Sequence, residues 1–191
     1  MNKPLYLFVG PRGSGKTTIV DELECRYQYK SLQSYTTRPP RCEDEYGHIF
    51  VSDNEFDNLQ NIIAYTEYNG FRYCATEELI NNADLYVIDC DGVDTLLSKY
   101  NSDRTICIFY FDTTVSVRIN RMIERGDSDM AIVSRLHNDE QFDWYDKLEK
   151  IVWNYSKLQD KQNVELYRVN ANSSKANVLG LVLYYINKVE E

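Results

Sequence analysis

A glycine-rich segment near the start of the sequence has the residue types that bind a nucleoside triphosphate. Residues 10–18 read GPRGSGKTT and fit the pattern G-x-x-x-x-G-K-[ST]. Glycines let backbone N–H groups turn toward phosphate oxygens, and the helix that follows adds the positive end of its dipole. We therefore expect Lys16 to be catalytic, bridging the β- and γ-phosphates of ATP, and the Thr17 hydroxyl to bind Mg²⁺. The expected ATP-binding residues of this loop are Gly10, Pro11, Arg12, Gly13, Ser14, Gly15, Lys16, Thr17 and Thr18.

Two aspartates come at the end of a predicted strand. Asp89 and Asp91 end the run LYVIDCD over residues 85–91. In an open parallel sheet, ligands bind at the carboxyl ends of the strands. Asp89 is therefore a candidate ligand for Mg²⁺ or for one of its waters, because a phosphate loop needs a metal partner. The alternative is that this aspartate caps a turn or a helix.

Short apolar runs alternate with helical patterns and would position these residues. Strands are predicted over 5–9, 31–36, 85–89, 105–111 and 164–169, and helices over 16–27, 93–100, 114–125, 130–157 and 174–189. This alternation predicts an α/β fold with a mostly parallel sheet and helices on both faces. It also favours a phosphate loop over a glycine-rich turn with an incidental lysine, since a strand precedes the loop and a helix follows it. Residues 37–84 break the alternation; a capping box at Ser52 and Glu55 and a hairpin turn at Asn69-Gly70 indicate a small insertion.

Composition and charge exclude several classes of partner. The chain has 191 residues with 21 Lys and Arg against 30 Asp and Glu, a net charge of −9, so we expect no nucleic-acid polymer as a partner. No apolar stretch approaches the roughly 20 residues that span a bilayer, so we expect no membrane partner. The five cysteines are an odd number without a C-x-x-C pair, which is typical of reduced thiols in a cytoplasmic protein.

Four further motifs follow one another along the chain: SYTTRPPR over 34–41, YNGFRY over 68–73, VIDCD over 87–91 and ERGDSD over 124–129, with Arg135 beyond. They closely resemble motifs of the guanylate kinase family, and the resemblance follows the family's order from about residue 4 to about residue 140. The resemblance implies that arginines grip an acceptor phosphate, a task that suits their planar fork. The implied acceptor-binding residues are Ser34, Arg38, Arg41, His48, Tyr73, Thr76 and Asp91. Arg125 and Arg135 are implied as catalytic residues of a lid, and Asn172 lies at the position of the adenine-side loop.

The resemblance also implies a fold and an activity. The fold is a three-layer P-loop kinase core with a five-stranded, mostly parallel sheet, all in one domain. The core is expected over 1–33, 85–113 and 158–191, the acceptor-binding insertion over 34–84, and the lid with its flanking helices over 114–157. The activity is transfer of the γ-phosphoryl group of ATP, with Mg²⁺, to GMP, dGMP or a related phosphorylated acceptor by a monomer or homodimer. Arg118 and Arg121 have the spacing of an ordinary solvated helix face.

The sequence departs from the family where the base is read. Ala64 and Ala75 stand where the family has a guanine-binding glutamate and a small hydroxyl residue, and His48 replaces a tyrosine that contacts phosphate. Another nucleotide or ribose 1,5-bisphosphate therefore stays open as the acceptor. A non-catalytic interaction module of the same family is the alternative class. The presence of Lys16 and the lid arginines favours the enzyme.

Overall fold

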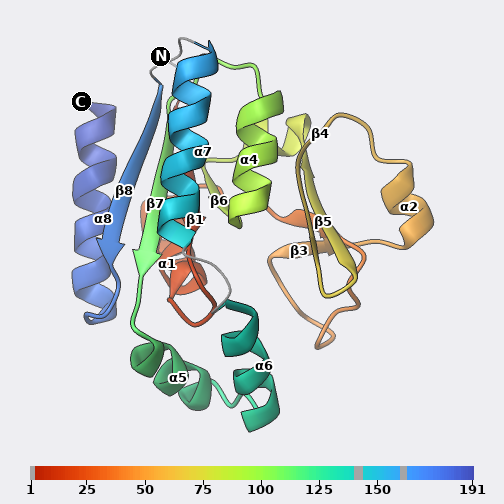
Figure 1. Cartoon of the computed structure of the whole chain (residues 1–191), viewed down its shortest axis with the longest axis vertical. Helices are drawn as coiled ribbons and strands as arrows, with labels where there is room; N and C mark the ends of the chain where they lie inside the picture. Colours follow the sequence, from red (N-terminus) through yellow and green to blue (C-terminus); the bar gives the residue numbers. More distant parts are fainter. Residues whose placement is uncertain (1–2, 140–143, 160–162) are drawn as a thin grey trace.

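The core of the chain is a parallel sheet of four strands. The computed structural model describes residues 3–139, 144–159 and 163–191. The sheet has the order β6-β1-β7-β8, and all three pairings are parallel. Figure 1 shows the strands side by side, with the phosphate loop at the carboxyl end of β1. The strands are β1 (Leu5–Val9), β6 (Leu85–Val87), β7 (Ile106–Asp112) and β8 (Val164–Asn170).

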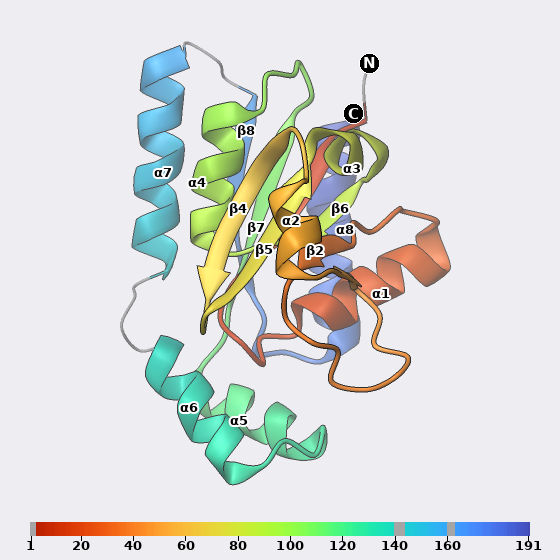
Figure 2. The same cartoon turned by 90° about the vertical axis from the view of Figure 1, so that its right-hand side faces the viewer.

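Helices cover both faces of this sheet, which explains why its central strands are apolar without alternation. Every residue of β1 is buried, and so are the first six residues of β7. One face packs against α1 (Lys16–Tyr27) and α8 (Lys175–Glu190), and the other against α4 (Cys90–Lys99) and α7 (Trp144–Gln159). Figure 2 shows these two pairs of helices on opposite sides of the strands. The predicted helix over 130–157 is two helices, α6 (Asp129–Asp139) and α7, and residues 140–143 between them lie outside the described part.

The prediction of five core strands is wrong because the second predicted strand leaves the core sheet. Ser31 forms a single parallel bridge with Leu85, and the Leu32 N–H donates to the Leu85 carbonyl at 2.8 Å. The chain then diverges, and β2 (Ser34–Thr36) pairs with strands of the insertion instead. The apolar and β-branched residues of this run fit either sheet, so their pattern could not show which sheet they join.

The insertion forms a second sheet of the order β3-β2-β5-β4. Asn69 and Gly70 both have positive φ angles, 51° and 74°, and make the tight turn between β4 and β5. Ser52 and Glu55 form the predicted capping box of a short helix. The elements are β3 (His48–Phe50), α2 (Asp53–Asp57), β4 (Ile62–Tyr68), β5 (Phe71–Thr76) and α3 (Glu77–Asn82). The sheet lies to the right of the core in Figure 1 and places its strands beside α4.

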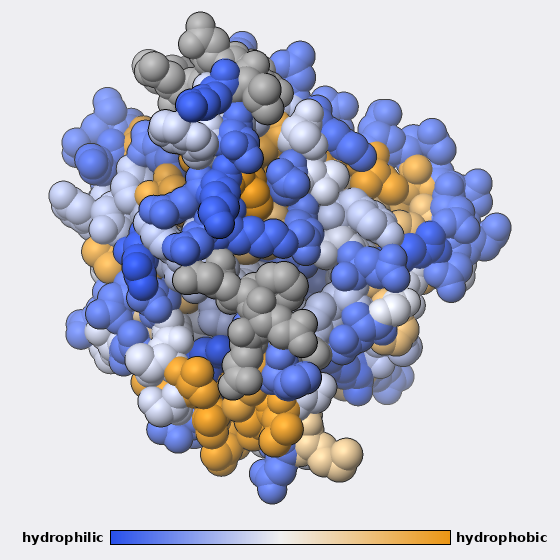
Figure 3. Space-filling view, in the orientation of Figure 1, coloured by the Kyte–Doolittle hydropathy of each residue, from blue (hydrophilic) through white to orange (hydrophobic). Residues whose placement is uncertain are grey.

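Two helices, α5 (Val115–Glu124) and α6 (Asp129–Asp139), lie beyond the carboxyl ends of the core strands (Figure 1). Figure 3 shows apolar atoms gathered at this end of the molecule, where Ile123, Met130 and Val133 are exposed. Among the described residues, no helix is long and apolar enough to cross a membrane.

Candidate active site

The phosphate loop turns sharply between β1 and α1, and its glycines allow the turn. Gly13 has a φ of 76°, and a Cβ atom there would lie 3.0 Å from the Arg118 carbonyl oxygen. Gly15 has a φ of 96° and caps α1, so the first N–H groups of the helix face the loop. Lys16 folds back over the loop and donates from Nζ to the carbonyls of Gly10 at 2.6 Å and Pro11 at 2.9 Å. Burial lowers the pKa of Lys16 to about 8.

Two arginines of α5 donate hydrogen bonds to backbone carbonyls of this loop, so the expectation that they form a solvated face is wrong. Arg118 is only 5% exposed, pairs with the buried Asp139 of α6, and donates from Nε to the Arg12 carbonyl at 2.7 Å. Arg121 donates to the carbonyls of Ser14 and Ala171, both at 2.8 Å. The R-x-x-R spacing predicts a common face, but the loop that packs on this face is distant in sequence.

A cavity of about 820 Å³ lies on the outer side of the loop, between α1, α5 and α6. Thr17 and Thr18 line it from the first turn of α1, Arg125 lines it from the end of α5, and Arg135 lines it from α6. Arg125 and Arg135, the two arginines predicted to belong to a lid, both form ion pairs with Asp127. Asn172 does not line this cavity in the described structure, because its side-chain oxygen accepts from the Thr114 N–H at 2.8 Å.

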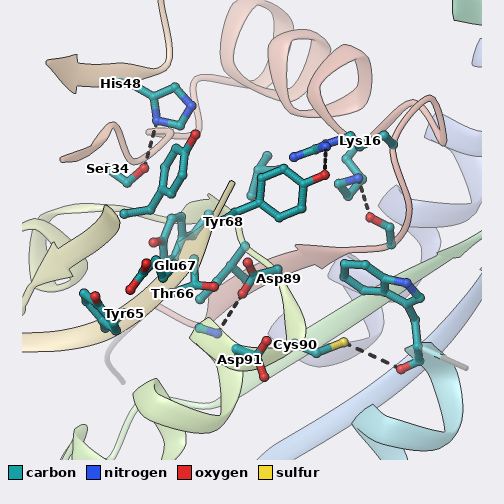
Figure 4. Close-up of a pocket in the computed structure, with 18 of the residues that line it drawn as sticks. Lys16, Ser34, His48, Tyr65, Thr66, Glu67, Tyr68, Asp89, Cys90 and Asp91 are labelled. Atoms are coloured by element: carbon teal, nitrogen blue, oxygen red, sulfur yellow. Dashed lines mark hydrogen bonds between the residues drawn. The ribbon is translucent and has the colours of Figure 1, made fainter. Parts of the chain in front are cut away.

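A second cavity of about 320 Å³ lies between the loop, the insertion and the start of α4. Figure 4 shows Ser34 and His48 at one end, Asp89 and Asp91 along the base, and Lys16 at the far side. Three side chains that could carry positive charge, Arg12, Lys16 and Arg41, line both cavities. The predicted acceptor residues that line the second cavity are Ser34, Arg38, Arg41, His48, Tyr73 and Asp91.

Arg38 and Arg41, the two arginines predicted to bind an acceptor phosphate, are both hydrogen-bonded to one carboxylate. Glu45 accepts two hydrogen bonds from the Arg38 guanidinium, at 2.8 and 3.1 Å, and one from the Arg41 backbone N–H at 2.6 Å. The hydrogen bonds from the Arg38 guanidinium are the main reason that the pKa of Glu45 is lowered to about 2. Ser34 Oγ and His48 Nδ1 share a hydrogen bond of 3.0 Å, and burial followed by the charge of Arg38 lowers the pKa of His48.

The two strand-end aspartates differ in what they contact. Asp89 caps α4 by accepting from the Gly92 N–H at 2.8 Å, and burial raises its pKa. It therefore does act as a helix cap, while it also lines the second cavity. Asp91 pairs with Lys147 of α7 at 2.5 Å. No cluster of three or more His, Cys, Asp or Glu side chains able to hold a metal occurs in the described part of the chain.

The three positions expected near a base lie away from this cavity. Ala64 and Ala75 face each other across β4 and β5 and are 1% and 0% exposed within the apolar core. The Thr76 side chain accepts from the Leu79 N–H at 3.4 Å, which makes it the cap of α3 rather than a group of the cavity.

Several residues that line the second cavity were missed from the sequence. They are Thr66, Glu67 and Tyr68 of β4, Asp139 at the end of α6, and Trp144 and Lys147 of α7. The turn at Asn69-Gly70 could have placed the β4 residues beside the predicted site. Nothing in the local pattern of α7 shows that its first turns reach this cavity.

Comparisons with known proteins found guanylate kinases that are similar to this chain. A guanylate kinase of Polaromonas sp. (strain JS666 / ATCC BAA-500) is 30% identical over 145 residues, 70% of this chain and 70% of the relative. A guanylate kinase of Thermobifida fusca (strain YX) is 30% identical over 145 residues, 70% of this chain and 73% of the relative. The guanylate kinase of Thermotoga maritima is 26% identical over 189 residues, which are 92% of this chain and 90% of the relative. The solved guanylate kinase from Anaplasma phagocytophilum has a TM-score of 0.46 at 16% identity, with 83% of this chain and 86% of that chain covered. No family model matches the chain.

A phosphate loop on a parallel sheet, with a second charged cavity beside it, is the layout of a P-loop phosphotransferase. The chain belongs to the guanylate kinase family, because relatives at 30% identity cover 70% of it and at least as much of themselves. It is an ATP-dependent nucleotide kinase of that family.

Proposed function

We propose that the protein transfers the γ-phosphoryl group of ATP to GMP, dGMP or a related phosphorylated acceptor. The observation that carries the proposal is the pair of adjoining cavities that share Arg12, Lys16 and Arg41. Phosphoryl transfer needs positioning and neutralisation of charge more than it needs a protein base. Basic side chains at the boundary of two cavities supply both.

We assign the outer cavity to ATP and the cavity beside the insertion to the acceptor. Backbone N–H groups of residues 10–18 would hold the ATP phosphates, while Lys16 would neutralise their charge. Arg125 and Arg135 would close over the transferring group and exclude water, which limits hydrolysis of ATP. The assignment divides the chain into a core over 1–33, 85–113 and 158–191, an insertion over 34–84, and a lid with its flanking helices over 114–157. Within these ranges, residues 1–2, 140–143 and 160–162 lie outside the described part.

An acceptor phosphate would bind at Arg38. Its Nε is buried and has no hydrogen-bond partner among the described residues. A buried donor without a partner costs free energy, and a bound phosphate oxygen would remove that cost. Arg41, Ser34, His48 and Tyr73 line the same cavity and would complete the grip.

Mg²⁺ would accompany ATP, and the donors at the loop fit it. Magnesium usually keeps several waters and binds substrate phosphates with one or two protein ligands, so a large carboxylate cluster is not required. The exposed Thr17 hydroxyl at the start of α1 would be a direct ligand, while Asp89 would act through water because one of its oxygens already caps α4. The ion would neutralise charge on the phosphates during transfer.

One observation favours an acceptor without guanine. Ala64 and Ala75 form an apolar pair in which neither side chain can hydrogen-bond to a base. Loss of one such bond reduces discrimination by about 1–3 kcal/mol. The polar groups that line the cavity from β4, α4 and α7 are instead Thr66, Glu67, Asp91 and Lys147. Another nucleoside monophosphate or ribose 1,5-bisphosphate is therefore the second candidate acceptor.

A coupled assay of ADP release tests the proposal. The reactions contain ATP, Mg²⁺ and one acceptor each from a panel of ribo- and deoxynucleoside monophosphates with ribose 1,5-bisphosphate. We expect one acceptor class to give turnover that the Lys16→Ala variant lacks. Turnover with GMP or dGMP alone supports the first candidate, and turnover with another acceptor supports the second. ATP binding without acceptor-dependent ADP release from any of them contradicts both.

A further inference from the structure

Arg12 is the residue of the phosphate loop whose side chain reaches the insertion. Its Nη1 donates a hydrogen bond to the Tyr68 hydroxyl, and its Cζ lies 3.8 Å from the centroid of the Tyr68 ring. Tyr68 is the last residue of β4, so this contact joins two segments that are 56 residues apart. Figure 4 shows the Tyr68 ring extending across the cavity toward the side where Lys16 lies. Arg12 therefore stands between the two cavities rather than in open solvent.

The backbone on both sides of the Arg12 side chain is also held. Its N–H donates to Asp139 Oδ2 at 3.2 Å, and its carbonyl accepts from Arg118 Nε at 2.7 Å. The two groups that hold it are paired with each other and buried. Helices α5 and α6 thus fix the backbone of Arg12, while β4 fixes its guanidinium.

Other positively charged side chains line the same cavities as the Arg12 guanidinium. Arg12 and Arg41 line both cavities, and Arg135 lines the outer cavity, which is assigned to ATP. Burial and then the charges of Arg125, Arg41 and Arg12 lower the pKa of Arg135. An anion bound between these arginines would relieve their repulsion, and the phosphoryl group in transfer carries its charge on three equatorial oxygens.

We propose that Arg12 is a catalytic residue that binds the transferring phosphoryl group, and that Tyr68 is the positioning residue that holds its guanidinium at the boundary of the cavities. The inference rests on the proposed function. The bond from the γ-phosphorus to the β–γ bridging oxygen breaks, and its electron pair stays on ADP. A bond from an acceptor phosphate oxygen to the γ-phosphorus forms. Arg12 donates hydrogen bonds to the other γ-oxygens and transfers no proton.

A double-mutant cycle on kcat tests the pairing of the two residues. Arg12→Gln should lower kcat by at least about 100-fold, since a donor aimed at developing charge has effects of this size, and should change the acceptor KM little. Tyr68→Phe keeps the ring and removes the hydroxyl, and should lower kcat by about fivefold. In the Arg12→Gln background it should have no further effect. An equal loss in both backgrounds, or unchanged kcat in Arg12→Gln, overturns the proposal.

A matched control is Tyr46→Phe, which removes another tyrosine hydroxyl of the insertion. Tyr46 is 60% exposed, and its hydroxyl donates to Glu24 outside both cavities. This variant should leave kcat unchanged. A loss equal to that of Tyr68→Phe would mean that the effect is not specific to the Arg12 contact, and it overturns the role of Tyr68.

Calorimetric binding of ATP and ADP tests Arg12 without any acceptor. Arg12→Gln should weaken the binding of ATP by about tenfold or more, because a hydrogen bond from a charged group is lost. It should weaken the binding of ADP by less than about twofold. Equal weakening of both ligands would mean that Arg12 only shapes the loop, and it overturns the proposal. If the wild-type protein binds ATP and phosphorylates no acceptor, the proposed function fails, while the comparison of ATP with ADP still decides the contact of Arg12 with the γ-phosphoryl group.

Discussion

The buried ion pair between Arg118 and Asp139 should be a major determinant of stability, because it joins α5, α6 and the phosphate loop. The side chains are 6% and 5% exposed, and Asp139 also accepts from the Arg12 N–H. Asp139→Asn keeps the shape of the side chain and leaves the Arg118 charge unpaired. Removal of one partner of a buried pair costs about 3–5 kcal/mol of the free energy of unfolding. For a chain of this length, that corresponds to a fall in Tm of roughly 6–20 °C.

Urea unfolding measures this cost, provided that the slope of free energy against urea stays constant. The double variant Arg118→Met/Asp139→Leu is the matched control, because it removes both charges and should recover most of the lost stability. It should still bind ATP more weakly, since the bonds to the Arg12 backbone are gone. A loss below about 1 kcal/mol in Asp139→Asn would refute the reasoning, since exposed pairs have effects of that size.

Three further predictions concern the substrates. Burial lowers the pKa of Lys16 to about 8 in the free protein, and bound phosphates should raise it again. Binding of ATP therefore takes up a proton, and the Kd for ATP should weaken about tenfold from pH 7 to pH 9. A Kd for ATP that is constant over this range contradicts the assigned role of Lys16. Arg38→Ala should raise the acceptor KM by about tenfold or more and the ATP KM by less than about twofold, and equal rises in steady-state kinetics would remove Arg38 from the acceptor site. Ala64→Glu would place a carboxylate at a position that is 1% exposed in the apolar core and does not line the second cavity, so it should lower the free energy of unfolding and should not increase kcat/KM for GMP; a stably folded variant with a higher kcat/KM for GMP would contradict this placement of position 64.

The phosphate loop and most of the α/β alternation could be predicted because their signals are local. A glycine pattern between a strand and a helix determines the backbone of residues 10–18 without reference to the rest of the chain. The capping box at Ser52 and the turn at Asn69-Gly70 are local in the same sense. Such features need only neighbouring residues, and the sequence pattern contains all of them.

Features that depend on distant contacts could not be predicted. The run over 31–36 suits a strand, but only the contacts of Ser31 and β2 show that it passes from one sheet to another. Arg118 has the spacing of a solvated helix face, whereas the loop at Gly13 and the carboxylate of Asp139 cover it. The role of Arg12 depends on Tyr68, 56 residues away.

Direct transfer between the two cavities is the central claim, and the ratio of the two products tests it most directly. ATP, Mg²⁺ and the active acceptor are incubated with the protein, and ADP and phosphorylated acceptor are both quantified by mass spectrometry. We predict equal amounts of the two products from the wild-type protein and neither from Lys16→Ala. ADP formed without phosphorylated acceptor, or equal activity in Lys16→Ala, would contradict the claim.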